Sequence, residues 1–219
     1  SYFGRLNYDF NETYMLSLIM RADGSSNFAK GHQWGYFPSV SAGWVISNEK
    51  FMQSTSKWLT FLKLRAGWGQ NGNDNIDASL WRSSFVFDNA ALYSFDNNKT
   101  GATTGARPTR LANEELTWET SEQLNIGLDA RFLDGRLAFT ADWYNKKTKD
   151  LLVEVGNSSV AGFDSHWANA GTVENKGLEL TLGWNDNIGK DFSYNVGWNM
   201  AYNKNNVSKV NNSNHFVEG

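Results

Sequence analysis

Residues 124–143 read LNIGLDARFLDGRLAFTADW. Apolar side chains recur at every second position on either side of Asp134 and Gly135, and mostly polar, charged or small residues fill the positions between them. Alternation with a period of two is typical of strands that have one apolar and one polar face. Asp-Gly is a favoured sequence for a tight hairpin turn. This stretch therefore predicts a β-hairpin with strands at 124–132 and 137–143.

The same alternation continues outward in both directions along the chain. It predicts further strands at 2–10, 14–21, 36–46, 62–69, 178–184 and 192–202, with a ninth candidate at 81–87. The apolar faces of the eight clear strands carry no charged residue, whereas the opposite faces carry Arg5, Asp9, Arg21, Lys63, Arg65, Asp129, Arg131, Asp142 and Glu179. A lysine or arginine that faces lipid near the bilayer midplane costs roughly 2–4 kcal/mol. One face is therefore suited to lipid and the other to water.

The connections between the predicted strands alternate in length. Short turns are expected at 11–12, 134–135 and 186–191, and a medium turn at 48–60 that carries a short helix with Asn48 as its N-cap. Longer loops are expected at 23–33, 71–116 and 149–172, and a last one opens at 203. Membrane β-barrels join their strands by short periplasmic turns and longer extracellular loops. The alternation therefore predicts antiparallel, up-and-down transmembrane β-barrel strands, an all-β fold.

Aromatic residues fall at both ends of the predicted strands. The outer ends, near the long loops, carry Tyr36, Trp68, Trp143 and Tyr202, and the inner ends carry Phe10, Tyr14, Trp44, Phe132, Trp184 and Phe192. Amphipathic rings are enriched at the two membrane–water interfaces. We therefore predict membrane-interface positions for Tyr36, Trp44, Trp68, Trp143, Trp184 and Tyr202.

Composition excludes several classes of function. The 219 residues include 10 Trp, 8 Tyr and 14 Phe but no cysteine, and the net charge is -3. An acidic chain is a poor partner for nucleic acid, and without cysteine there is no disulfide, thiol catalysis or cysteine-ligated metal. No run of apolar residues approaches the roughly 18 needed for a transmembrane helix. Alternation alone also fits a soluble β-sandwich or small barrel, such as a carbohydrate-binding or adhesive domain, or a small autonomous eight-stranded barrel.

Several long segments resemble the barrel of SusC-like (SusC/RagA) TonB-dependent transporters. They are SYFGRLNYDF from residue 1, RADGSSNFAKGHQWGYFPSVSAGWVISNEKF from residue 21, WLTFLKLRAGWGQNGNDNI from residue 58, LANEELTWETSEQLNIGLDARFLDGRLAFTADWYNKKTKDLL from residue 111, and NAGTVENKGLELTLGW from residue 169. Their order and spacing make the resemblance specific. It is weakest at 80–110 and after about 204.

The resemblance carries several expectations. It implies an outer-membrane barrel of about 22 strands closed by an N-terminal plug, which imports glycans or peptides. It also implies a SusD-like surface lipoprotein as a lid, energy from the TonB complex, and no cofactor. All of 1–219 would then belong to one barrel domain of a Gram-negative bacterium. Because Ser1 opens directly into a strand-like run, with no signal peptide, plug or TonB-contacting segment before it, we expect a fragment of a longer protein.

No constellation in the sequence predicts an enzyme or a metal site. His32, His166 and His215 are widely separated and loop-placed, without ligand spacing. The cluster of Glu114, Glu115, Glu119 and Glu122 implies no partner geometry of the kind that a glycosidase needs. We read these residues as surface histidines and a solvated loop base.

Substrate contacts are expected from the outer loops, where aromatic faces could stack on sugar rings or peptide side chains and polar groups could supply hydrogen bonds. The predicted contact residues are Trp81, Arg82, Tyr93, Phe95, Arg107, Asp164, His166 and Trp167, together with Asp96. Packing of the loops, or contact with the lid protein, explains the same residues equally well. Glycines on the polar face either make room for a plug, the reading we favour, or relieve strain in a bent sheet; they are Gly43, Gly67, Gly69, Gly127, Gly183 and Gly197.

Overall fold

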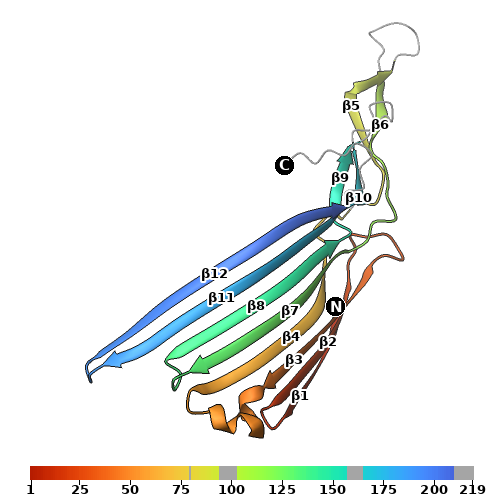
Figure 1. Cartoon of the computed structure of the whole chain (residues 1–219). Helices are drawn as coiled ribbons and strands as arrows, with labels where there is room; N and C mark the ends of the chain where they lie inside the picture. Colours follow the sequence, from red (N-terminus) through yellow and green to blue (C-terminus); the bar gives the residue numbers. More distant parts are fainter. Residues whose placement is uncertain (79, 94–102, 157–164, 210–219) are drawn as a thin grey trace.

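Eight long strands form one curved antiparallel sheet (Figure 1). The computed structural model describes residues 1–78, 80–93, 103–156 and 165–209. Neighbours in the sheet follow the order β1, β2, β3, β4, β7, β8, β11, β12, so every wall strand pairs with the next one along the chain. The bounds are β1 (Tyr2–Phe10), β2 (Tyr14–Gly24), β3 (Trp34–Val45), β4 (Leu59–Asn73), β7 (Glu119–Phe132), β8 (Leu137–Lys149), β11 (Thr172–Ile188) and β12 (Phe192–Lys209).

These are the eight strands that the alternation predicts, and several are longer than predicted. β11 begins at Thr172 and β12 runs to Lys209, so the strand pairing continues well past residue 203, where we expected a loop. In this extension Glu174 pairs with Asn206 and Lys147 on one face, and Asn175 pairs with Asn205 and Lys146 on the other, so both faces carry polar residues. Backbone pairing continues there after the hydrophobic alternation has ended, which is why the alternation marks the strand ends too early.

Two small hairpins lie beyond the outer ends of the wall strands (Figure 1). One pairs β5 (Ser84–Tyr93) with β6 (Thr103–Arg110), and the other pairs β9 (Leu152–Gly156) with β10 (Ser165–Asn169). The ninth wall strand proposed at 81–87 is therefore wrong. Its alternation belongs to the first of these hairpins, which is a sheet of its own.

The connection between β3 and β4 is helical, but it differs from the helix that we predicted. It contains two 3₁₀ helices, η1 (Ile46–Asn48) and η2 (Lys50–Thr55). Asn48 caps neither of them and donates instead from Nδ2 to the carbonyl of Glu12 at 3.1 Å. Among the described residues, neither helix has the length or apolar character needed to cross a membrane.

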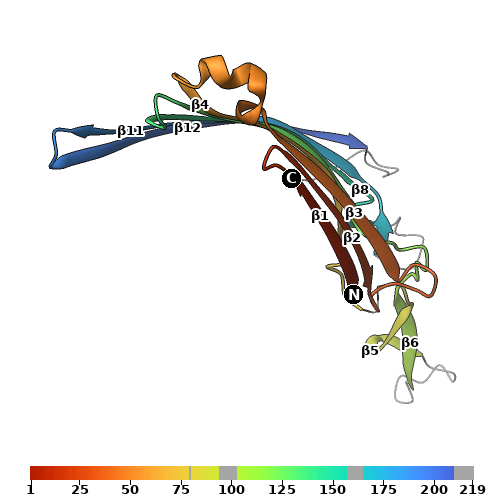
Figure 2. The same cartoon turned by 90° about the horizontal axis from the view of Figure 1, so that it is seen from below.

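The register places apolar side chains opposite one another across the whole sheet. A row on one face joins Tyr14, Trp44, Leu64, Leu128, Ala141, Leu180 and Met200. The next row, on the other face, joins Met15, Gly43, Arg65, Gly127, Asp142, Glu179 and Ala201. Seen from below, the sheet bends into an arc with a convex and a concave side (Figure 2). The arc is that of a barrel wall.

Candidate functional site

The polar face of the sheet contains a cluster of three charges from three neighbouring strands. The guanidinium of Arg65 in β4 donates from Nε to Oδ2 of Asp129 in β7 at 2.7 Å, and from Nη2 to Oδ1 of Asp142 in β8 at 3.0 Å. Thr140 adds a hydroxyl donor to Asp129 at 3.2 Å. One cation thus forms ion pairs with two carboxylates and links three strands of the wall.

Gly127 lies directly beneath this cluster, paired on one side with Arg65 and on the other with Asp142. A Cβ at this position would lie 2.4 Å from Oδ1 of Asp142 and 2.8 Å from the Arg65 guanidinium. The ion pairs therefore fill the space above Gly127. At Gly197, by contrast, nothing lies within 4 Å of a built Cβ. At Gly127 the absence of a side chain leaves space for the ion pairs of the sheet itself. At Gly197 the idea that a glycine makes room for a plug stays a prediction.

A small hydrophobic core lies at the outer end of the sheet. Phe28 from the β2–β3 loop, Leu80 from the β4–β5 segment and Leu116 from the β6–β7 segment are all buried and pack together. Trp118 joins this rim core, with its ring centroid 5.5 Å from that of Phe28. Three connections that are far apart in the sequence are therefore joined into one packed unit.

Hydrogen bonds from two asparagines join the β9–β10 hairpin to the same unit. The side chain of Asn169 exchanges two bonds of 2.9 Å with the backbone of Thr117, and donates a third to the carbonyl of Asp150. Asn113 donates from Nδ2 to the carbonyl of Trp167 at 2.8 Å. The amide side chains replace the backbone ladder that irregular loops lack.

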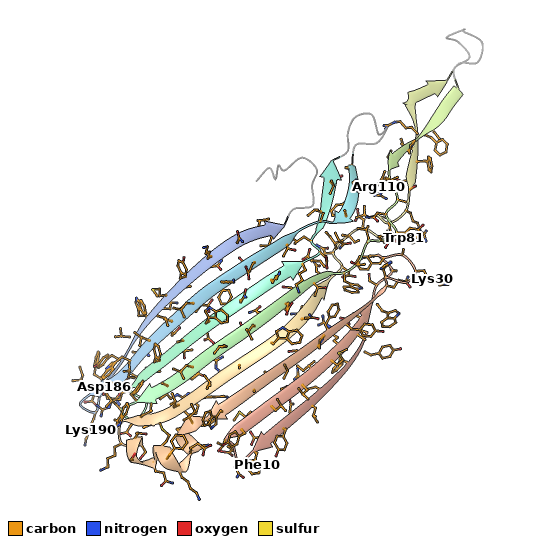
Figure 3. All side chains as sticks on the ribbon, turned by 45° about the vertical axis from the view of Figure 1, so that its right-hand side comes forward. Phe10, Lys30, Trp81, Arg110, Asp186 and Lys190 are labelled. Carbon is orange, nitrogen blue, oxygen red and sulfur yellow. The ribbon has the colours of Figure 1, made fainter. Side chains whose placement is uncertain are left out.

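The predicted substrate-contact residues are spread over this rim. Trp81 and Trp167 are partly buried and pack against the rim core. The Arg82 guanidinium stacks 4.2 Å from the ring of Trp81, which lies at the outer end of the sheet (Figure 3). His166 is in β10, opposite Val155. The structure brings the two tryptophans and Arg82 to the rim core, and substrate contact by any of them remains a prediction.

The other predicted contact residues lie further out or outside the described part. Arg107 is in β6, paired with Val86. Tyr93 ends β5. Phe95, Asp96 and Asp164 lie outside the described residues. In the described part of the chain, no group of three or more histidine, aspartate or glutamate side chains could hold a metal ion.

The glutamates at the base of the long loops anchor the outer ends of the strands. Glu122 accepts bonds from Trp68 Nε1 at 2.9 Å and from Lys149 Nζ at 2.8 Å. Glu119 accepts one from Asn73 at 3.2 Å. From the sequence we expected this cluster to be a solvated loop base. Its partners could not be identified there, because strand pairing depends on register rather than on the spacing of residues in the chain.

Comparison with known proteins identifies the family. Residues 1–217 match the family described as "TonB dependent receptor-like, beta-barrel". The chain belongs to this family. Its members are transporters of the Gram-negative outer membrane and not enzymes, so the soluble β-domain is set aside.

Individual relatives place the chain within the SusC/RagA-like group. It is 38% identical over 224 residues to the TonB-dependent receptor SusC of Bacteroides thetaiotaomicron, covering 100% of this chain and 22% of the relative. It is 39% identical over 209 residues to TonB-dependent receptor P26 of Formosa agariphila, covering 94% of this chain and 20% of the relative. The structure of the RagAB peptide transporter superposes with a TM-score of 0.83 at 30% identity, over 95% of this chain and 22% of that one. The chain thus spans about a fifth of the length of these relatives.

In a TonB-dependent receptor barrel the apolar face of the sheet meets lipid and the polar face lines the lumen. Trp68 has its ring among apolar neighbours and donates its Nε1 proton to Glu122. Trp44 likewise donates its Nε1 proton to Glu49 at 3.1 Å. Trp184 donates its Nε1 proton to the hydroxyl of Tyr194 at 3.3 Å. Rings with one apolar and one hydrogen-bonded end suit a membrane interface.

The remaining predicted interface aromatics also lie on the apolar face. Trp143 and Tyr202 both pair with Leu178, and Tyr36 pairs with Ala22. Their side chains are exposed on the sheet. The depth of these six residues in the membrane stays a prediction.

Proposed function

We propose that this chain forms eight consecutive wall strands of an active importer of glycans or peptides, working with a SusD-like surface lipoprotein and energised by the TonB complex. The observation that carries the proposal is the combination of a TM-score of 0.83 and 30% identity to the RagAB peptide transporter over 95% of the chain. The 38% identity to SusC supports the same group of receptors.

Within such an importer the wall strands would supply stiffness rather than chemistry. The cluster of Arg65, Asp129 and Asp142 joins three strands on the lumen face, and ion pairs that also form hydrogen bonds hold their partners in fixed geometry. A receptor that takes in large cargo has to keep its wall in register while its lumen contents move. The cluster meets that requirement.

The outer rim would be where cargo and the lipoprotein meet the chain. The rim core holds the bases of the long connections together, and the β5–β6 hairpin projects beyond it (Figure 1). Rigid supports improve binding because less freedom is lost on association. We assign cargo or lid contact to Trp81, Arg82, Arg107, His166 and Trp167 as part of this proposal.

The proposal is tested with the full-length receptor that contains this chain, affinity-tagged in its own outer membrane. Copurification of a surface lipoprotein, together with uptake of a labelled oligosaccharide or peptide that stops when TonB is deleted, is the expected result. A matched variant replaces the β5–β6 hairpin (84–110) by a short Gly-Ser linker and is expected to keep the barrel but weaken uptake. Uptake that persists without TonB, or purification with no lipoprotein, would contradict the proposal.

A further inference from the structure

The connection between β3 and β4 lies on the outside of the barrel wall, at the end of the tight turns. Both partners of the Glu49 carboxylate, the Tyr14 hydroxyl and Trp44 Nε1, belong to the apolar face of the sheet. Figure 2 shows the same placement, with the helical segment on the convex side of the arc. Residues 46–58 therefore lie against the lipid-facing side of the sheet. We call them the inner shelf because they lie at the inner ends of the strands, where the tight turns are.

The inner shelf is fixed to the turns on both sides of it. Asn48 donates to the carbonyl of Glu12 in the β1–β2 turn, and the Thr13 carbonyl accepts from the amide of Val45 at 2.8 Å. At the other end the Trp58 carbonyl accepts from the amide of Leu133 in the β7–β8 turn at 3.0 Å. These bonds place the shelf across the inner ends of several strands.

The outward side of the inner shelf exposes two large apolar rings. Phe51 is 65% exposed and Trp58 is 52% exposed. Trp58 stacks on Phe132, an apolar-face residue, with ring centroids 6.0 Å apart. A groove between the shelf and the first turn is lined by Phe10 and Tyr14 on one side and by Lys50 and Phe51 on the other. Aromatic rings of the sheet and of the shelf thus share this groove, whose remaining lining is polar.

Two cations lie beside these rings. Lys50 and Lys57 are exposed, and within the described part of the chain neither forms an ion pair. The carboxylate of Glu49, which lines the groove beside Lys50, is already engaged by Tyr14 and Trp44. Free ammonium groups next to exposed aromatic rings are typical of elements that lie in the plane of a membrane interface.

We propose that the inner shelf is a binding site for anionic phospholipid of the periplasmic leaflet. Lys50 and Lys57 hold the headgroup phosphates, while Phe51 and Trp58 enter the boundary between headgroups and acyl chains. Two arguments select lipid as the occupant: the shelf continues the lipid-facing side of the barrel, and its unpaired charges have the sign that an anionic headgroup needs. The tight turns place this end of the sheet in the periplasm.

Lipid retention by the purified full-length receptor is the first test. Native mass spectrometry with added phosphatidylglycerol compares the wild type with a Lys50→Gln, Lys57→Gln variant. A Lys30→Gln, Lys190→Gln variant removes the same charge elsewhere, from the outer β2–β3 loop and from the β11–β12 turn (Figure 3). We expect affinity to fall roughly fivefold for each shelf lysine removed, with little change in the control. Equal retention by wild type and shelf variant would overturn the proposal.

The depth of Phe51 in the membrane is an independent test. A nitroxide at Phe51→Cys, in receptor reconstituted into vesicles of phosphatidylglycerol and phosphatidylethanolamine, should collide more often with oxygen than with an aqueous nickel chelate. The same label at Lys190→Cys provides the water-exposed reference. If the Phe51 label is as accessible to nickel as the reference, the shelf faces water. It would then be free for a periplasmic protein, and the lipid proposal is overturned.

Discussion

Arg65 and Asp129 join β4 to β7 through two hydrogen bonds, of 2.7 Å and 3.2 Å, although the two residues are 64 positions apart in the chain. Asp142 extends the same contact to β8. Each of these side chains is about one-third exposed, so solvent weakens the attraction without removing it. In register Arg65 pairs with Gly127, and its guanidinium reaches past this glycine to the carboxylates of both β7 and β8.

Replacing Arg65 by methionine is expected to destabilise the barrel. The change leaves Asp129 and Asp142 close together with no cation between them, at a cost of about 1–2 kcal/mol after allowance for solvent. The temperature at which the folded full-length receptor loses its fast migration on a denaturing gel measures the effect. Arg136→Met is the control, because the 3.6 Å pair of Arg136 with Asp186 is an exposed turn contact. Equal shifts in the two variants would show that the lumen cluster has no special role.

Gly127→Ala tests the space beneath the same cluster. The added methyl group has to displace the Asp142 carboxylate and the Arg65 guanidinium, and we expect a loss of about 1–3 kcal/mol from this overpacking. Gly197→Ala, where no atom lies within 4 Å, should be neutral or slightly stabilising. The same gel assay compares the two variants. A neutral Gly127→Ala would mean that the cluster tolerates rearrangement.

Acid should weaken the attachment of the inner shelf. Hydrogen bonds from Tyr14, and then from Trp44, lower the pKa of the Glu49 carboxyl below its usual value. A lowered folded-state pKa gives a stabilising contribution that is present above the unfolded pKa of about 4.3 and is lost as pH falls through the folded value. Glu49→Gln should therefore be less stable than wild type at neutral pH and should approach it in acid. Hydrogen exchange of residues 46–58 at both pH values measures this, and a pH-independent difference would contradict the assignment.

Phe28→Ala should loosen the rim without unfolding the wall. Phe28 is 0% exposed and is one of the two largest fully buried side chains in the described residues, and truncating a buried phenylalanine costs about 3–5 kcal/mol. Because the rim core lies at the outer ends of the strands, we expect faster hydrogen exchange at 23–33, 74–82 and 111–118, with little change in the central strand amides. Phe85→Ala, which removes an exposed ring, is the control. Protection that falls equally in loops and strands would show that rim and wall unfold together.

The sequence predicts the wall well because each wall strand has one face in lipid. A single face that excludes charge makes the period of two visible, as in β7 and β8 around Asp134 and Gly135. The signal ends where both faces meet water, and so the outer parts of β11 and β12 are missed. The same reason explains the wrong ninth strand: the alternation at 81–87 is real, but it belongs to a hairpin that has left the wall.

The contacts across the sheet and in the rim are not predictable in the same way. Phe28, Leu80 and Leu116 are single apolar residues in three separate connections, with no periodicity to mark them. Which carboxylates meet Arg65 depends on the register of β4 against β7, and an irregularity between Leu59 and Phe61 shifts that register. Aromatic residues at strand ends were expected from the sequence. The position of the inner shelf on the lipid-facing side was not expected. In a short 3₁₀ segment, the spacing of apolar residues does not show which side chains are exposed.

The most direct test of the account is the environment of each position along β7 in the full-length receptor. Nitroxide labels are placed one at a time at residues 124–129, in receptor reconstituted into phospholipid vesicles, and their collisions with oxygen and with a nickel chelate are measured. We expect a period of two, with Leu124, Ile126 and Leu128 in lipid and Asn125, Gly127 and Asp129 facing the aqueous lumen. Accessibility to nickel at all six positions, with no alternation, would contradict it.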